Sequence, residues 1–191
     1  TPNDGIDDDG NGYVDDTWGW DFVNNDNNPI DDQMHGSAVS SVMVAAQDGA
    51  GMVGICPWCK VMAVKVLDSQ GSGSLDVVAS GIIYAAQNGA RAINLSLGAG
   101  SGAQTLENAV NFAWNHGTVV AAAAGNDGQN ITNYPAAYAN AMAVASTNGA
   151  DKHSCFSNYK TGYVSVAAPG EGIYVIDINN STTGYNYYSG T

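Results

Sequence analysis

The order of apolar and polar positions predicts helices and strands that alternate along the chain. Residues 1–34 are rich in Asn, Asp and Gly and predict loops, apart from an aromatic and apolar stretch at 18–23. Small apolar residues over 37–47 predict a buried helix, and the β-branched run 61–67 predicts a strand. Ser74 suits the N-cap of a helix that reaches residue 88, and Gly89 suits its end.

The second half continues the alternation. Residues 92–97 predict a strand, 105–115 a helix, and 118–124 an apolar strand suited to the centre of a parallel sheet. Residues 141–146 and 163–168 predict two further strands. This spacing is typical of βαβ units, so we expect an α/β fold, a three-layer doubly wound parallel sheet with helices on both faces. We expect residues 1–191 to belong to a single domain.

Composition narrows the classes of partner. The chain has 191 residues, of which 45% are hydrophobic and only 12% charged, enough for one sizeable core. Its formal charge is −13, which argues against nucleic acid or an anionic membrane as partner, because both attract clustered Lys and Arg. No apolar run reaches the roughly 18 residues that span a bilayer, and the first residues do not have the pattern of a signal peptide.

Three cysteines leave the pairing open. Cys56 and Cys59 have the C-x-x-C spacing of redox motifs and of half a zinc site, and Cys155 stands apart. No second C-x-x-C is present and the three His are scattered, which disfavours zinc. We expect a local disulfide between Cys56 and Cys59 in an exported protein, with two free thiols as the alternative.

Polar residues gather where a parallel sheet binds its ligands, beyond the carboxyl ends of the strands. Residues 32–37 bring His35 to the start of a predicted helix. Residues 94–98 and 123–127 end two predicted strands and bring in Ser96 and Asn126. Each signal alone is weak, because a lone His at a helix start or a lone Asn after a strand is commonly structural.

Together with two further motifs, these segments resemble subtilisin-like serine proteases, and the resemblance covers the whole chain. The motifs occur in the family's order: His35-Gly36-Ser37, Ser96-Leu97-Gly98, Ala123-Ala124-Gly125-Asn126, Tyr134-Pro135-Ala136 and Ala168-Pro169-Gly170. The resemblance implies a secreted, calcium-stabilised serine endopeptidase that cleaves polypeptides.

It also implies roles for individual residues. His35 matches the general base and Asn126 the side-chain donor of the oxyanion hole. Ser96, Leu97, Gly98 and Gly125 match the walls of the substrate pocket. The family's extended edge, which pairs with the substrate backbone, is matched by Gly71, Ser72 and Gly73, for which a flexible turn is the alternative.

The chain departs from the family pattern in two ways. Ser37 and Ala38 follow His35 where the family usually has Thr and a second His. The family's orienting Asp lies upstream of an acidic loop like residues 4–16, and its nucleophilic serine follows a Gly-Thr pair like Gly190-Thr191, so neither has a match within 1–191. We therefore expect an incomplete catalytic domain that is inactive alone and has a propeptide or the missing segments as further partners. The alternative is an inert fragment or pseudoenzyme that binds only peptide or calcium.

More than half of the 18 acidic residues lie between Asp4 and Asp32, and their spacing predicts calcium as the cofactor. A first loop alternates oxygen-bearing residues, with Asp16 or Asp15 to close the shell: Asp7, Asp9, Asn11 and Tyr13. A second loop resembles a calcium loop of the thermitase branch: Asp21, Asn24, Asp26 and Asn28, with a carbonyl from Ile30. In a third, residues 46–52, Asp48 matches a side-chain ligand. The alternatives are an unliganded acidic loop for the first and an Asx-rich turn for the second.

Overall fold

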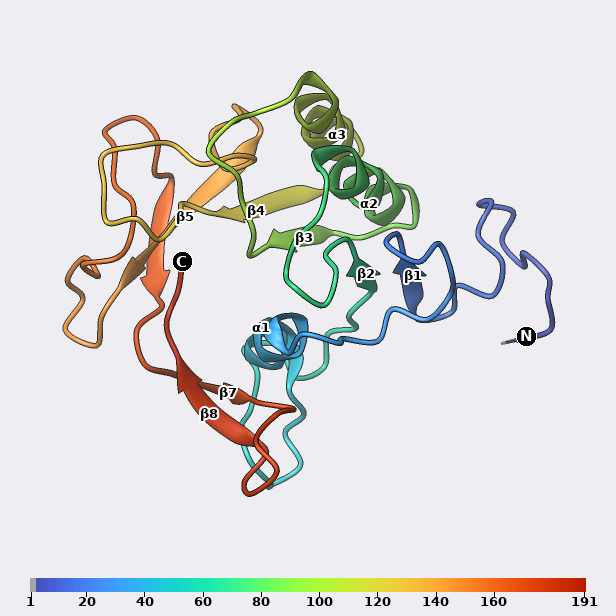
Figure 1. Ribbon diagram of the computed structural model, residues 1–191, viewed down its shortest axis with the longest axis horizontal. Helices are drawn as coiled ribbons and strands as arrows, with labels where there is room; N and C mark the ends of the chain where they lie inside the picture. Colours follow the sequence, from blue (N-terminus) through green and yellow to red (C-terminus); the bar gives the residue numbers. More distant parts are fainter. Residues whose placement is uncertain (1–2) are drawn as a thin grey trace.

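The computed structural model describes residues 3–191, and four parallel strands organise it (Figure 1). Their order in the sheet is β3-β4-β5-β6. They comprise β3 (Ala92–Leu95), β4 (Val119–Ala123), β5 (Ala141–Thr147) and β6 (Val166–Pro169). The register places Asn94 opposite Ala121 and Val144 opposite Val166. Because the strands are parallel, their carboxyl ends lie along one edge of the sheet.

Two strand pairs accompany this sheet. The strands β1 (Gly19–Asp21) and β2 (Ala63–Lys65) pair in parallel, and β7 (Ile173–Ile176) and β8 (Tyr185–Tyr188) form an antiparallel hairpin. Helices α2 (Leu75–Gln87) and α3 (Gln104–Asn115) lie together on one side of the parallel strands, and α1 (His35–Val44) lies on the other (Figure 1). The predicted α/β fold with helices on both faces of a parallel sheet is confirmed.

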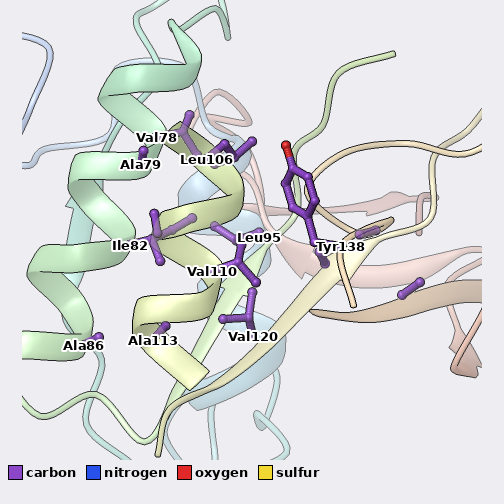
Figure 2. Close-up of a cluster of buried hydrophobic side chains, with 14 residues drawn as sticks. Val78, Ala79, Ile82, Ala86, Leu95, Leu106, Val110, Ala113, Val120 and Tyr138 are labelled. Atoms are coloured by element: carbon purple, nitrogen blue, oxygen red, sulfur yellow. The ribbon is translucent and has the colours of Figure 1, made fainter. Parts of the chain in front are cut away.

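The main core lies where α2 and α3 pack on one another and on β3 and β4 (Figure 2). Leu106 and Val110 of α3 are fully buried, and they meet Val78 and Ile82 of α2 in one cluster with Val120 of β4. Full burial of such a side chain contributes roughly 1.5–3 kcal/mol. This cluster therefore fixes the positions of β3 and β4, and the polar segments at residues 94–98 and 123–127 lie at the ends of these two strands.

Helix α2 agrees with its predicted signals. The Ser74 hydroxyl accepts the Val77 N–H at 3.2 Å, and Gly89 adopts a φ of +81° just beyond the helix. Helix α3 likewise ends at Asn115, followed by Gly117 with a φ of +77°. Positive φ is the conformation for which a helix end selects glycine.

Helix α1 departs from its prediction at both ends. It begins at His35 rather than 37 and ends at Val44 rather than 47. The chain then folds back, and the N–H groups of Gly54 and Ile55 donate to the carbonyls of Ala45 and Val42. These bonds satisfy carbonyl groups at the end of α1 that would otherwise accept N–H groups from a further helical turn. The helix can therefore end at Val44.

Several strands also differ from prediction. The run 61–67 pairs only over Ala63–Lys65, and the strand expected at 163–168 spans Val166–Pro169. Tyr163 lies outside it because its hydroxyl donates to the Ala124 carbonyl at 2.9 Å. Strand β1 and the β7–β8 hairpin were not predicted. The hairpin contains Asp177, Asn180 and Gly184 in its turn.

Cys56 and Cys59 form a disulfide, as predicted, with their Cα atoms 5.3 Å apart. Cys155 is free and exposed. Across residues 3–191, no helix has both the length and the apolar character needed to cross a bilayer.

Candidate active site

A cleft of about 490 Å³ opens where the polar segments meet. It is lined by the N-terminus of α1, the chain after β3, the chain after β4 and the last three residues. The structure thus brings together six of the nine residues predicted to be catalytic or to bind substrate: His35, Ser96, Leu97, Gly98, Gly125 and Asn126.

His35 is the first residue of α1 and is exposed to the cleft. Its Nε2 atom lies 2.8 Å from the Ser96 carbonyl oxygen. A carbonyl oxygen can only accept, so Nε2 carries the ring proton in this arrangement. The bond ties the imidazole to the segment that was predicted to form one wall of the substrate pocket.

Asp31 holds the chain that leads into His35. Its Oδ1 atom accepts the N–H groups of Gln33 at 2.9 Å and Met34 at 2.8 Å, and its Oδ2 atom accepts the Ser37 N–H at 2.7 Å. Burial would raise the pKa of Asp31, but these bonds, with one to the Ser37 hydroxyl, outweigh it and hold the pKa below its usual value. Asp31 therefore acts as the cap of α1 from outside the helix.

Met34, directly before His35, has a φ of +93°. This is a region that residues with a side chain rarely adopt, at a cost of about 1–3 kcal/mol. The sharp turn lets the three bonds to Asp31 form while the helix starts at the next residue.

The wall to which Ser96 belongs is built from the chain after β3, residues 96–100. Ala99 pairs with Tyr134 through two backbone hydrogen bonds of 2.9 Å, which bring residues 131–134 beside Gly98. A Cβ atom on Gly98 would overlap the Asn133 side-chain amide. Asn133 therefore lies directly against Gly98, and a larger residue at 98 would have to displace the Asn133 side chain.

Asn126 is fixed from the end of the chain. Its Oδ1 atom accepts both the backbone N–H and the hydroxyl of Thr191 at 3.0 Å, and that hydroxyl in turn accepts the Gly125 N–H at 3.2 Å. With Oδ1 engaged, Nδ2 is the Asn126 group free to donate within the cleft, and it faces Gly190. An imidazole and an oriented amide donor thus share one cleft.

The family of this chain follows from its similarity to known proteins. A family model described as "Subtilase family" matches residues 3–191. The chain belongs to the subtilase family.

Relatives and solved structures agree. The subtilase is 50% identical to "Thermitase" of Thermoactinomyces vulgaris over 157 residues, which are 82% of this chain and 56% of that protein. It is 48% identical to "Thermophilic serine proteinase" of Bacillus sp. (strain AK1) over 176 residues, 91% of this chain and 42% of that protein. The chain spans about half the length of these relatives.

The structure of a cold adapted subtilisin-like serine proteinase matches with a TM-score of 0.80 at 32% identity. The match covers 90% of this chain and 60% of that one. The fold is therefore that of the subtilisin-like proteases.

Gly71, Ser72 and Gly73 of the subtilase lie outside the lining of the cleft. Gly71 is part of a tight turn in which the Asp68 N–H donates to the Ser72 carbonyl at 2.8 Å. A Cβ atom on Gly71 would lie 3.8 Å from the Gln33 side chain, so the turn is next to the segment that enters α1. The role of these three residues as a substrate edge stays a prediction.

The first acidic loop gathers oxygens around one nitrogen. Asn11 Nδ2 lies 3.2 Å from Asp9 Oδ2, 2.9 Å from Asp16 Oδ2 and 2.9 Å from Asn88 Oδ1. An amide nitrogen has two hydrogens, so three oxygens exceed what it can satisfy. The carboxylate of Asp7 instead accepts the backbone N–H groups of Gly10 and Gly12 at 2.8 Å and of Asn11 at 3.2 Å. The bond from Gly12 is the main reason that the pKa of Asp7 is lowered.

Tyr13 and Asp16 also join this loop to the core. The ring of Tyr13 contacts those of Trp20, Phe22 and Tyr84. The Tyr84 hydroxyl donates to Asp16 Oδ2 at 2.5 Å. Burial, followed by this bond, raises the pKa of Tyr84 far above its usual value. Aromatic packing and the Asp16 bond therefore hold the loop against helix α2.

The second acidic loop has the bonds of an Asx turn. Asp21 is 1% exposed, and its carboxylate accepts the N–H groups of Val23 at 2.7 Å and Asn24 at 3.0 Å, together with the Asn24 amide at 2.9 Å. Asp26 accepts the Asn28 N–H at 3.0 Å. In the third loop, Asp48 accepts the Ala50 N–H at 3.0 Å.

Across residues 3–191, no three or more His, Cys, Asp or Glu side chains are arranged to hold a metal ion. A cation here would need amide, carbonyl or water oxygens for part of its shell. Of the three loops, the first fits this requirement best, because Asp9, Asp16 and Asn88 already converge.

Three residues of the site were not predicted from the sequence as contributors to it: Asp31, Asn133 and Thr191. Asp31 had a usable signal, since an Asp followed by two residues and a turn often accepts backbone N–H groups. Thr191 was matched to the family's Gly-Thr pair, but its bonds to Asn126 had no signal, and neither had the place of Asn133, because their partners are distant in the sequence.

Proposed function

We propose that the protein containing this chain is a secreted serine endopeptidase of the subtilisin type, which hydrolyses polypeptides. The observation that supports this most is the placement of His35 and Asn126 on one cleft, with the Asn126 amide oriented by Thr191. The names of the relatives, thermitase and thermophilic serine proteinase, agree with this activity.

In the proposed chemistry, His35 transfers the proton of the serine hydroxyl, and Asn126 stabilises the negative charge of the oxyanion. The serine that follows a Gly-Thr pair in the family attacks the peptide carbonyl, and His35 Nε2 takes its proton. The same proton then passes to the leaving amine. Nε2 must first give up its bond to the Ser96 carbonyl and carry a lone pair, with the ring proton on Nδ1. An orienting carboxylate beside Nδ1 would favour that tautomer.

Asn126 supplies the other half of the mechanism. As the carbonyl oxygen becomes an oxyanion, the Asn126 Nδ2 donates to it, and its bonds to Thr191 hold the donor in place beforehand. Removal of this donor should lower kcat by about 10²–10³-fold, the range known for subtilisin itself.

The test uses the full-length protein with a denatured protein substrate and a serine-directed phosphonylating probe. We expect turnover that the probe abolishes and that His35→Ala removes. We also propose that residues 1–191 alone do not hydrolyse peptides, since they hold no serine matched to the nucleophile. Probe labelling of a serine within 1–191 would contradict that assignment, and an unlabelled full-length protein would favour an inert relative.

We propose calcium as a stabilising ion at the first acidic loop. Asp9, Asp16 and Asn88 would supply side-chain oxygens, which hard cations prefer. The ion would offset the repulsion among the clustered carboxylates. The loops at Asp21 and Asp48 are the other candidates, and their carboxylates, like that of Asp9, accept backbone N–H groups of their own turns.

Secretion is proposed from the disulfide between Cys56 and Cys59, since such bonds persist in oxidising compartments. Alkylation of the protein recovered from the culture medium, with and without prior reduction, tests this. Within residues 1–191, we expect one alkylated cysteine, Cys155, before reduction and three after it. Retention of the protein inside the cell would contradict the proposal.

A further inference from the structure

We propose that Asn158 is a positioning residue for catalysis, which holds residues 124–129 and thereby the oxyanion donor Asn126. The inference rests on the proposed protease function. Asn158 lies 32 residues after Asn126 in the sequence. Its side chain nevertheless forms all four of its hydrogen bonds with the segment around Asn126.

The side-chain oxygen of Asn158 closes the turn after Asn126. Its Oδ1 atom accepts the N–H groups of Asp127 at 3.0 Å and Gln129 at 3.2 Å. The side-chain nitrogen reaches the other side of Asn126, where Nδ2 donates to the Ala124 carbonyl at 3.2 Å. It also donates to Asp127 Oδ2 at 2.9 Å.

These four bonds use the whole capacity of a carboxamide. The backbone N–H of Asn158 adds a fifth bond, to the Gly125 carbonyl at 2.8 Å. Asn158 is 0% exposed, so removal of its side chain leaves these buried backbone and side-chain groups without their partner. Asn126 is therefore held between two segments, 124–125 and 127–129, that are both tied to one buried amide.

The shape of the backbone agrees with this arrangement. Gly125 has a φ of +104°, and a Cβ atom there would overlap the Asn158 amide nitrogen. The turn that presents Asn126 to the cleft thus closes around the Asn158 side chain. An oxyanion donor is effective because it is held in place before the charge develops. Loosening of this segment should therefore affect the transition state more than substrate binding.

The experiment compares Asn158→Ala with a matched control, Asn148→Ala, in the full-length protein. Asn148 also accepts two backbone N–H groups, from Ala150 and Lys152, but in a turn away from the cleft. We expect Asn158→Ala to lower kcat by ~10-fold or more with KM nearly unchanged, a loss smaller than removal of the donor itself. The control should keep its kcat. Both are measured well below their unfolding temperatures.

A second pair of variants separates positioning from simple packing. Asn158→Asp places a carboxylate against that of Asp127 and should lower kcat. Adding Asp127→Asn restores a donor between the two side chains and should recover part of the loss. A residue that only fills space would show no such rescue.

Hydrogen exchange gives a readout that does not depend on activity. In Asn158→Ala, the amides of Asp127 and Gln129 should exchange faster, while the control leaves them unchanged. Unchanged exchange at both amides, or unchanged kcat in an active enzyme, would overturn the inference. A wild-type protein without protease activity would instead overturn the proposed function, and the exchange data would still decide whether Asn158 holds the segment.

Discussion

The carboxylate of Asp31 accepts the backbone N–H of Ser37 at 2.7 Å, so an acid outside α1 closes the first turn of the helix that starts with His35. We expect Asp31→Ala to cost about 1 kcal/mol of unfolding free energy, as for loss of a helix cap. It should also lower protease activity, because His35 is the residue whose place the cap defines. Denaturant unfolding and kcat/KM measure the two effects.

The neighbouring acid provides the control. Asp32 forms an ion pair with Lys65 at 3.3 Å and is half-exposed, so Asp32→Ala should cost only about 0–1 kcal/mol and leave His35 in place. Equal losses of activity in the two variants would contradict the role given to Asp31.

Met34→Gly should stabilise the protein relative to Met34→Ala. Alanine keeps the unfavourable φ of +93°, whereas glycine adopts it freely. After the entropy cost of glycine, a difference of about 1 kcal/mol should remain. Thermal unfolding of the two variants tests the prediction. A more stable alanine variant would show that the turn relaxes when the Met side chain is removed.

Leu106→Ala should cost about 2–5 kcal/mol, because Leu106 is 0% exposed within the cluster between α2, α3 and the sheet (Figure 2). Trp114, on the same helix but 53% exposed, is the control, and Trp114→Ala should stay within about 0.5 kcal/mol. Chemical denaturation measures the free energy of unfolding of both variants. Equal losses for Leu106→Ala and Trp114→Ala would mean that the exposed Trp114 ring is covered in solution.

Tyr188→Phe should flatten the pH dependence of stability at both ends. The Tyr188 hydroxyl donates to Asp177 Oδ2 at 2.8 Å, which lowers the pKa of Asp177 and raises that of Tyr188. The acid's contribution is present above its unfolded pKa, near 3.8, and is lost as the pH falls through the lower folded value. The tyrosine's contribution is present below its unfolded pKa, near 10, and is lost as the pH rises.

Unfolding should therefore be followed from pH 2 to 11, with Tyr187→Phe as the control. Tyr187 is on the same strand and is 66% exposed. If the control changes the acid limb as much as Tyr188→Phe does, the bond to Asp177 is not the cause.

Calcium in excess should raise the unfolding temperature above that measured with a chelator. An ion at 100 times its dissociation constant adds ~2.7 kcal/mol by linkage. Asp9→Ala should reduce this response, while Asp151→Ala, an exposed acid outside the loops, should not. Asp21→Ala tests the second loop in the same way. A wild-type response in both loop variants would remove the calcium proposal.

Local sequence signals were enough to predict the helices and the central strands. Ser74 and Gly89 lie close to the two ends of helix α2, and Val120 and Ala122 within the apolar run of β4 are buried. Such elements are set by contacts within a few residues or by burial alone. His35 and Asn126 were predicted as site residues because their motifs resemble those of a known family, and the structure places both on one cleft.

The tertiary structure decided the rest. Three-residue strands such as β1 exist only through a partner some 44 residues away, Ala63 opposite Gly19. Tyr163 lies outside the strand predicted for it, and its hydroxyl donates to the Ala124 carbonyl. The Asn158 side chain bonds to the segment around Asn126, which lies about 30 residues earlier in the sequence. Each of these outcomes depends on a hydrogen-bond partner far away in the sequence. No pattern in neighbouring residues records such a partner, because a buried polar group is satisfied only once the whole chain has closed around it.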